Sequence, residues 1–203
     1  FSGDQLWNSI SKIPLDCLVT TEETRLALRD AFYFEPVPTV SRVVFLGTPH
    51  AGSPKANRPV GRLGTKLVDE PSSMNAIRNQ LLRDNPGAFT EEFERRIPTS
   101  IDLLRPESPL LQEMNCLKYS DSVRLHSIIG CGYYLVGSGD SDKVVPVTSA
   151  RISEVESERL IISKHTKINS NEKALEELYR ILECHLVEPR VSETGYVVGR
   201  LQE

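Results

Sequence analysis

The stretch Ser141-Asp142-Lys143-Val144-Val145-Pro146-Val147 decides the predicted fold, together with the stretch Ser163-Lys164-His165-Thr166-Lys167-Ile168. A carboxylate, Asp142, follows one predicted strand, and an imidazole, His165, follows the next predicted strand and precedes a long helix. Open α/β sheets gather their functional side chains at the carboxyl ends of the strands. We therefore expect Asp142 and His165 to lie side by side at one edge of a sheet.

Short apolar stretches at residues 42–47, 123–132 and 159–163 predict the strands of this sheet. An unbroken run such as Val43-Val44-Phe45-Leu46 is typical of a strand buried on both faces of a parallel sheet. From residue 172 to 186 the apolar side chains recur at helical spacing, which predicts a helix, with Asn169 as its cap. The predicted class is α/β, with a mostly parallel sheet and flanking helices.

Residues 54–121 form a long insertion with many prolines and charges and no strand-like run. Helical spacing from Met74 to Leu82 predicts one helix, and residues 90–96 predict a second, shorter one. The insertion is too long for a simple connection between two strands. We interpret it as a helical cap or lid over a substrate pocket or, with equal support, as crossover helices that cover the sheet.

The two ends of the chain carry weaker signals. Trp7 is the aromatic anchor of a loop or short helix, and Thr20 and Glu23 have the spacing of a capping box ahead of a helix that ends near residue 34. Residues 189–203 follow a proline and form a tail with at most one short strand. Residues 1–188 are therefore assigned to one α/β domain that contains the insertion.

The amino-acid composition argues against several classes of function. The net charge of the 203-residue chain is -4 and no basic block occurs, which argues against a nucleic-acid partner. No apolar run approaches the roughly 18 residues of a transmembrane helix. The four cysteines are scattered without a C-x-x-C pair, so we expect mostly buried free thiols rather than disulfides or a zinc site. No His and carboxylate cluster has metal-ligand spacing, and no metal or other cofactor is expected.

Several of these stretches resemble α/β-hydrolases of the lipase and esterase type. Thr48-Pro49-His50-Ala51-Gly52-Ser53, after the first strand, is similar to a Thr-Pro-His-x-Gly-Ser loop of that superfamily. Residues 139–150 are similar to the Asp-Gly-Val-Val-Pro segment that holds the triad acid, with Lys143 where the pattern usually has Gly. His165, with Ile168 three residues on, matches the triad histidine, and residues 108–111 resemble part of the cap region. The resemblance covers about residues 4–186.

The resemblance implies a catalytic role for two residues and a pocket role for one loop. Asp142 is the expected acid, His165 is the expected base, and Thr48, Pro49, His50 and Gly52 are expected to line the substrate pocket. A nucleophile elbow of the form Gly-x-Ser-x-Gly occurs nowhere in the chain. In the family the elbow precedes the Thr-Pro-His strand. The chain begins with Phe1 and shows no leader peptide, so we expect it to be the C-terminal portion of a longer protein, whose compartment the sequence does not indicate.

Other residues compete for the same roles. Asp140 lies two positions before Asp142 and is the rival acid, whereas His50 is the rival base and is interpreted as a residue that shapes the pocket loop. His126 lies within a predicted strand and His185 ends the last helix, so both are interpreted as structural. A phosphate site at residues 47–52 has little support, because that loop has neither glycine-rich phosphate signature.

Two function classes follow. The first is a carboxylic-ester hydrolase that acts on lipid-type esters by acyl transfer to an upstream serine, with Asp142 and His165 as its acid–base pair and no turnover by this chain alone. The alternative is a non-catalytic domain of the same fold that binds a lipid or a protein. The presence or absence of the upstream Gly-x-Ser-x-Gly distinguishes the two. We also expect the apolar strand edge facing the missing strand to promote self-association.

Overall fold

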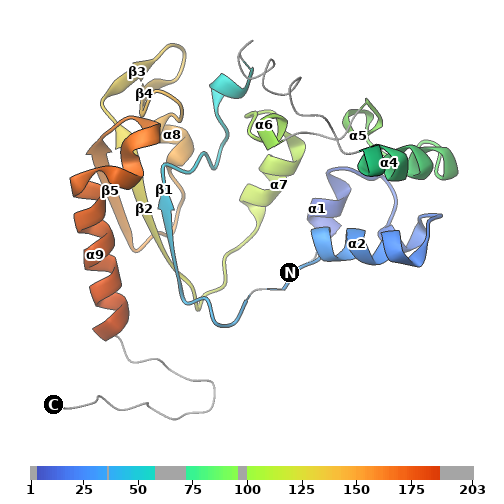
Figure 1. The fold of residues 1–203 in the computed structure, drawn as a ribbon, viewed down its shortest axis with the longest axis horizontal. Helices are drawn as coiled ribbons and strands as arrows, with labels where there is room; N and C mark the ends of the chain where they lie inside the picture. The colour runs from blue at the N-terminus through green and yellow to red at the C-terminus, as the bar shows by residue number, and fades with distance from the viewer. Residues whose placement is uncertain (1–3, 36, 58–71, 96–99, 188–203) are drawn as a thin grey trace.

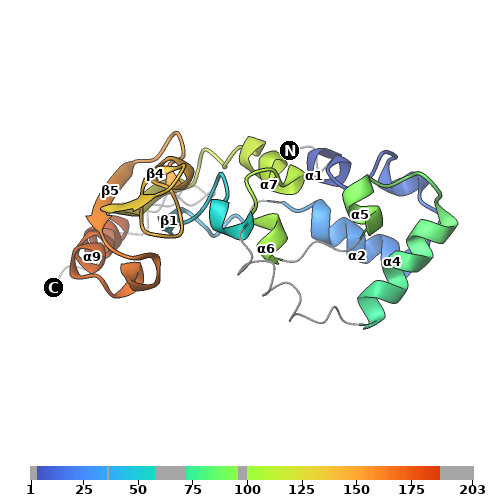
Figure 2. The same cartoon turned by 90° about the horizontal axis from the view of Figure 1, so that it is seen from above.

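The computed structural model describes residues 4–35, 37–57, 72–95 and 100–187. Its elements fall into two groups, which Figures 1 and 2 show apart from each other along the longest axis of the molecule. One group is a parallel sheet with its flanking helices. The other group contains helices from the N-terminal region and from the insertion.

The sheet contains three parallel strands in the order β1-β2-β5: β1 (Arg42–Leu46), β2 (Arg124–Cys131) and β5 (Ser157–Ile162). In this register Val44 pairs with His126, and Ile128 pairs with Arg159. The three apolar stretches therefore form the predicted strands, and the α/β class with a parallel sheet is confirmed. No strand in the described part of the chain pairs with the outer edge of β1.

Helices cover the sheet and complete its core. On one side Ile128, Ile161, Ile168 and Ala174 pack together, the last two from the 3-10 helix η3 (His165–Ser170) and from α9 (Glu172–Val187). A second cluster includes Ile129 and residues of the short helix α8 (Val147–Ala150). The predicted last helix is confirmed, although its cap is Asn171 rather than Asn169: the Asn171 side chain accepts from the Lys173 N–H (3.0 Å).

A small hairpin separates β2 from the acid-bearing turn. It consists of β3 (Tyr133–Leu135) and β4 (Gly139–Ser141), which pair in antiparallel fashion. No strand is predicted for these residues from the sequence. The side-chain hydroxyl of Ser141 donates to the Tyr133 carbonyl (2.7 Å), which fixes the hairpin at the base of that turn.

The helical group is built around Trp7, which is 1% exposed. It includes α1 (Asp4–Asn8), η1 (Leu15–Cys17), α2 (Glu22–Phe32), α4 (Ser72–Asp84) and α5 (Glu91–Arg95). Trp7, Leu81 and Phe89 belong to one buried cluster, so residues from both sides of β1 in the sequence share this core. The cap of α2 is Thr21, whose hydroxyl accepts from the Thr24 N–H, and not Thr20 as predicted.

The rest of the insertion lies between the two groups. It contains η2 (Pro54–Asn57), α6 (Ser100–Leu103) and α7 (Pro109–Cys116), and α7 is visible between the sheet and α2 in Figure 1. Because α4 and α5 pack with α1 and α2, they do not cover the sheet. Other parts of the insertion and the tail at 189–203 lie outside the described residues.

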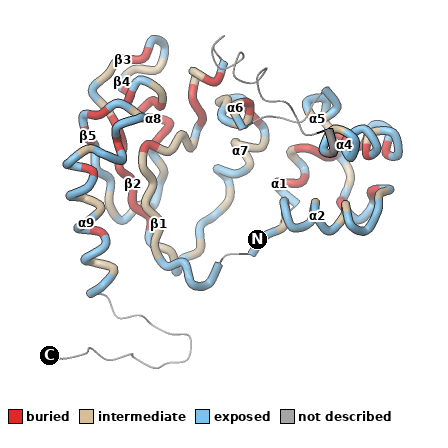
Figure 3. Tube along the Cα trace, viewed as in Figure 1, coloured by how far each residue is buried: buried red, intermediate tan, exposed pale blue. Residues whose placement is uncertain are grey.

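Buried residues concentrate along β2 and around α1, as Figure 3 shows. All four cysteines are free thiols, as predicted, but they are not mostly buried: Cys17 and Cys116 are exposed, and Cys131 and Cys184 are half-buried. Within the described ranges, no helix has the length and apolar character needed to cross a membrane.

Candidate acid–base site

Asp142 lies in the turn that follows β4, and its side chain is 1% exposed. One carboxylate oxygen, Oδ1, accepts hydrogen bonds from the backbone N–H groups of Val144 (2.9 Å) and Val145 (2.7 Å). A short polar side chain that bonds to the backbone two or three residues later stabilises a tight turn. Lys143 completes this turn with a φ of 79°, in the left-handed region. The local sequence thus fixes the carboxylate of Asp142.

His165 begins η3, directly after β5, and contacts Asp142 twice. Its ring Nδ1 lies 2.7 Å from Oδ2 of Asp142, and its backbone N–H donates to the Asp142 carbonyl oxygen (2.9 Å). Since a carboxylate only accepts hydrogen bonds, Nδ1 carries a proton and donates it, and in the neutral ring Nε2 is then the acceptor. The His165 side chain is 34% exposed, so solvent or a ligand can reach the ring. The structure therefore brings the two predicted residues together.

Two glycines at the ends of β1 and β2 make room for this pair. A Cβ on Gly130 would lie 2.6 Å from Cβ of Asp142. A Cβ on Gly47 would lie 2.5 Å from Cδ1 of Ile168 and 3.3 Å from Oδ2 of Asp142. Neither glycine was proposed as a site residue from the sequence, although Gly47 directly precedes the Thr-Pro-His loop. The pair accordingly sits over the carboxyl ends of both strands.

The loop at residues 48–53 is a compact turn beside the pair. The Gly52 N–H donates to the Pro49 carbonyl (2.9 Å), and the His50 N–H donates to the Thr48 carbonyl (3.0 Å). Gly52 has a φ of 80°, and a Cβ there would lie 2.8 Å from the Leu104 carbonyl oxygen. A side chain at position 52 would therefore strike the insertion.

Two serines join this loop to the turn that carries Asp142. The Ser53 hydroxyl donates to the Val144 carbonyl (2.6 Å), and the Ser149 hydroxyl donates to the Gly52 carbonyl (2.5 Å). Ser53 also donates its N–H to the Leu104 carbonyl (2.8 Å), so the insertion, the loop and the acid turn form one connected unit. Neither serine is among the site residues predicted from the sequence. Ser53 belongs to the Thr-Pro-His loop motif and Ser149 lies in the segment 139–150, but neither motif indicates that these hydroxyls join the loop to the acid turn.

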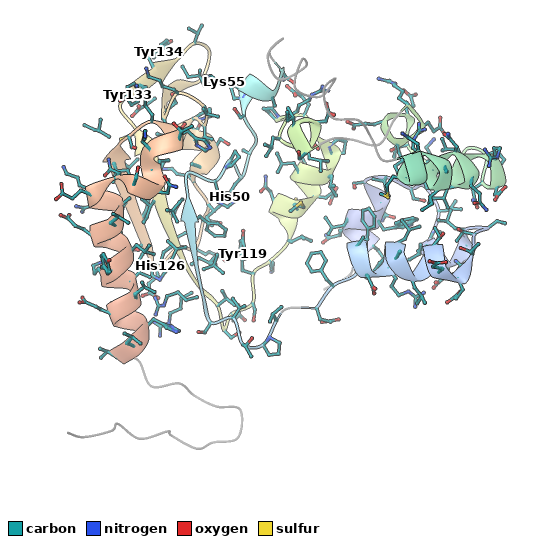
Figure 4. The ribbon with its side chains drawn as sticks, in the orientation of Figure 1. His50, Lys55, Tyr119, His126, Tyr133 and Tyr134 are labelled. Carbon is teal, nitrogen blue, oxygen red and sulfur yellow. The ribbon has the colours of Figure 1, made fainter. Side chains whose placement is uncertain are left out.

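His50 occupies a different environment from His165. Its ring packs edge-on against Phe45, with ring centroids 4.6 Å apart, and its backbone carbonyl accepts from the Asn115 side chain of α7. Burial lowers the pKa of His50, and its buried Nε2 has no hydrogen-bond partner among the described residues. Figure 4 shows His50 and Tyr119 on the side of β1 that faces α7. The structure places His50 at the boundary with the insertion and not in contact with Asp142.

The rival acid Asp140 also has a structural role. Its Oδ1 accepts from the backbone N–H groups of Gly132 (2.7 Å) and Ser141 (2.8 Å), which ties the hairpin to the end of β2. Asp142, two residues later, is therefore the carboxylate that reaches His165. His185 is half-buried in the last turn of α9.

His126 belongs to a polar network near the opposite ends of the strands. Its ring lies between the side chain of Arg42, on Nε2, and the hydroxyl of Ser157, which lies 2.8 Å from Nδ1. Burial and the positive charge of Arg42 lower the pKa of His126. In the neutral ring Nε2 accepts from the guanidinium, so Nδ1 donates to Ser157. Figure 4 shows His126 on the lower part of the sheet, away from the hairpin.

The pair can orient a proton acceptor at Nε2 of His165. No described side chain or backbone group forms a hydrogen bond with Nε2 of His165. The arrangement can hold an imidazole in one tautomer and stabilise its positive charge, which are the roles of the acid in a hydrolytic triad.

The described part of the chain contains no group of three or more His, Cys, Asp or Glu side chains that could hold a metal ion. Comparison with protein-family models, with curated proteins and with solved structures gave no match.

Proposed function

We propose that Asp142 and His165 are the acid and base of a serine hydrolase that cleaves carboxylic esters of the lipid type. The observation that carries the proposal is the 2.7 Å contact between Nδ1 of His165 and Oδ2 of Asp142, with the backbones of both residues also bonded to each other. Such a contact holds a catalytic histidine in the tautomer that a hydroxyl nucleophile requires. The resemblance of the flanking motifs supports the same reaction class.

In the proposed reaction a serine hydroxyl attacks the acyl carbon of the ester. Nε2 of His165 takes the hydroxyl proton, and the negative charge of Asp142 stabilises the imidazolium that forms. The imidazolium then gives the proton to the leaving alcohol. A water molecule, activated by the same Nε2, attacks the acyl-enzyme and releases the carboxylic acid.

The nucleophile of this proposal lies outside the 203 residues, on a strand that pairs with β1. Two observations support that place. The outer edge of β1 pairs with no described strand, and its residues Val43, Val44 and Phe45 are only half-buried. A strand added there would end beside Gly47, whose surroundings include Asp142 and His165. The proposed consequence is that residues 1–203 alone do not turn over an ester.

A fluorophosphonate probe and a chromogenic ester test the proposal on the intact protein. The expected result is a label on a serine outside residues 1–203, together with ester hydrolysis that His165→Ala abolishes. His185→Ala is the matched control, because His185 lies in the last turn of α9, whereas His165 precedes the start of that helix. A label on a serine within residues 1–203, or hydrolysis that survives His165→Ala, would overturn the proposal.

The second candidate is a non-catalytic domain of the same kind that binds a lipid or a protein. It is favoured by the single observation that Nε2 of His165 has no hydrogen-bond partner among the described residues. A folded intact protein that neither labels with the probe nor hydrolyses the ester would support this second candidate over the first.

A further inference from the structure

The helical group contains a large cavity that the acid–base pair does not use. Its volume is about 540 Å³, and its walls come from the end of α1, from α2, α4 and α5, and from the start of α7. In both views of the ribbon α1, α2, α4 and α5 lie on the side of the molecule away from the sheet, and α7 lies between them and the sheet. The volume falls within the range of roughly 300–1,000 Å³ found for small-molecule sites.

The walls of this cavity are largely apolar. They include Leu28 and Phe32 of α2, Ile77 and Leu81 of α4, and Phe93 of α5. Part of the lining is open to solvent: the Met74 side chain is 49% exposed and that of Ile77 is 42% exposed. Water in such a space finds few hydrogen-bond partners. An apolar ligand that displaced this water would therefore gain from the hydrophobic effect.

The charged groups that line the cavity disfavour a ligand with a carboxylate. Glu23 and Glu92 contribute two carboxylates, and Arg78 contributes the single guanidinium among the lining residues. The Arg78 side chain is already bonded to protein: Nε donates to the Phe93 carbonyl (2.8 Å), and Nη2 donates to the Glu94 carbonyl. A ligand carboxylate would be repelled by the carboxylates of Glu23 and Glu92, and the guanidinium of Arg78 already donates to protein carbonyls. This arrangement disfavours binding of an anion.

We infer that this cavity binds a mainly apolar small molecule without an anionic group, of the class of a long-chain alcohol or neutral ester, at a site separate from Asp142 and His165. The hydroxyl groups of Thr24 and Thr90 are part of the lining and offer hydrogen bonds to an uncharged polar head. The inference rests on the helical group alone and not on the proposed hydrolase activity.

Calorimetric titration of the intact protein with 1-decanol, decanoate and decylammonium tests the inference, because the three probes share a chain and differ in charge. Saturable binding of one decanol per chain is expected, with decanoate at least about tenfold weaker and decylammonium no weaker than decanol. Glu23→Gln should narrow that difference by strengthening decanoate binding. Absence of saturable decanol binding to folded protein, or decanoate binding as tight as decanol, would overturn the inference.

A matched pair of α2 variants locates the site. Ala27 lines the cavity and is exposed, so Ala27→Phe places a ring in the cavity without disturbing a packed core. Leu26 is exposed on the same helix and does not line the cavity, so Leu26→Phe is the control. Decanol affinity should fall at least about tenfold in Ala27→Phe and stay unchanged in Leu26→Phe. His165→Ala should bind decanol with wild-type affinity, because the cavity is separate from the acid–base pair; this result would distinguish the inference from the proposed hydrolase activity. Equal decanol affinity in Ala27→Phe and Leu26→Phe would show that decanol does not bind in this cavity.

Discussion

The two carboxylate oxygens of Asp142 have different hydrogen-bond partners, and substitutions can separate their roles. Its Oδ1 holds the backbone N–H groups of Val144 and Val145, and its Oδ2 faces His165. Asn keeps the first oxygen but replaces the second with an N–H donor, which forces the proton of His165 onto Nε2. We therefore expect Asp142→Asn to fold normally and to lose ester hydrolysis by the intact protein on the order of 10⁴-fold.

Asp142→Ala is the companion variant, because it removes both tasks. Two backbone N–H groups then lose their buried acceptor, at a cost of about 1–3 kcal/mol for each group that stays unsatisfied. Urea unfolding should show a lower free energy of unfolding for Asp142→Ala than for Asp142→Asn. Equal stabilities would mean that the two backbone hydrogen bonds do not hold the turn.

His126 makes stability depend on pH. Its pKa is lowered in the folded protein by burial and by Arg42, whereas the unfolded chain has the ordinary value of about 6.5. Below that pH the unfolded chain binds a proton that the folded protein does not, so the free energy of unfolding falls as the pH falls. The loss is at most about 1.4 kcal/mol per pH unit for this one group.

The measurement compares urea unfolding of the wild type and of His126→Gln at pH values from about 5 to 7.5. Below pH 6.5 the variant should show the flatter dependence, because it lacks this titration. His50, whose pKa is also lowered by burial, contributes with the same sign and remains in both proteins. Parallel curves would show that His126 takes up its proton equally well in the folded state.

At the residue scale the sequence predicted the pair but not its surroundings. Asp142 and His165 could be predicted because segments after successive strands meet at one sheet edge, although the β3–β4 hairpin lies between β2 and Asp142. The space that the two glycines leave for this pair could not be predicted. Gly130 lies inside a strand, and its neighbours in the sequence do not indicate that it contacts Asp142. Asp140 and Asp142 were separable only through their hydrogen bonds, because both are acids in the same short turn.

At the scale of elements, the turn after β1 depends on Gly47. Gly47 and Gly87 share a positive φ, 57° and 75°, so Ala at either position meets the same backbone strain of roughly 1–2 kcal/mol. A Cβ on Gly87 meets nothing within 4 Å, whereas one on Gly47 strikes buried Ile168 and approaches Asp142. Gly47→Ala should be the more destabilising in urea unfolding, and should lower ester hydrolysis while Gly87→Ala does not.

Hydrophobic patterns predicted the elements well and their boundaries less well. The runs around β1, β2 and β5 and the helical spacing of α9 lie where the sequence placed them. The caps moved by one or two residues, from Thr20 to Thr21 and from Asn169 to Asn171, because neighbouring residues with the same polar side chains compete for the role. The β3–β4 hairpin was missed, since its short strands carry no alternating pattern.

At the scale of the whole molecule, the chain has separate hydrophobic clusters for the helical group and for the sheet. The helical group holds the cavity, and α2 has no buried residue, so it should be the less stable of the two. Trp7 is the single tryptophan and reports on this group. In urea, Trp7 fluorescence should change at a lower concentration than that at which amides of β2 lose protection from hydrogen exchange. Coincident transitions would show one cooperative unit.

This division of the molecule could not be predicted from the sequence. Trp7, before β1, packs with Leu81 and Phe89, which come from the insertion after β1. Contacts between segments so far apart follow from tertiary packing, whereas periodicity describes each segment alone. Residues 54–121 were interpreted as a lid or as crossover helices. Neither interpretation includes the arrangement of α4 and α5, which share a core with the N-terminal helices.

The distribution of the cysteines gives the molecule built-in chemical reporters. Cys17 and Cys116 are exposed, and the half-buried Cys131 has a pKa raised by burial and a thiol that donates to the Ile161 carbonyl (3.3 Å). Because the thiolate is the reactive form, a maleimide should modify Cys17 and Cys116 within the native protein first and Cys131 last. Mass spectrometry of the alkylated peptides would then follow the separation of β2 from β5 at Cys131, with no substrate required.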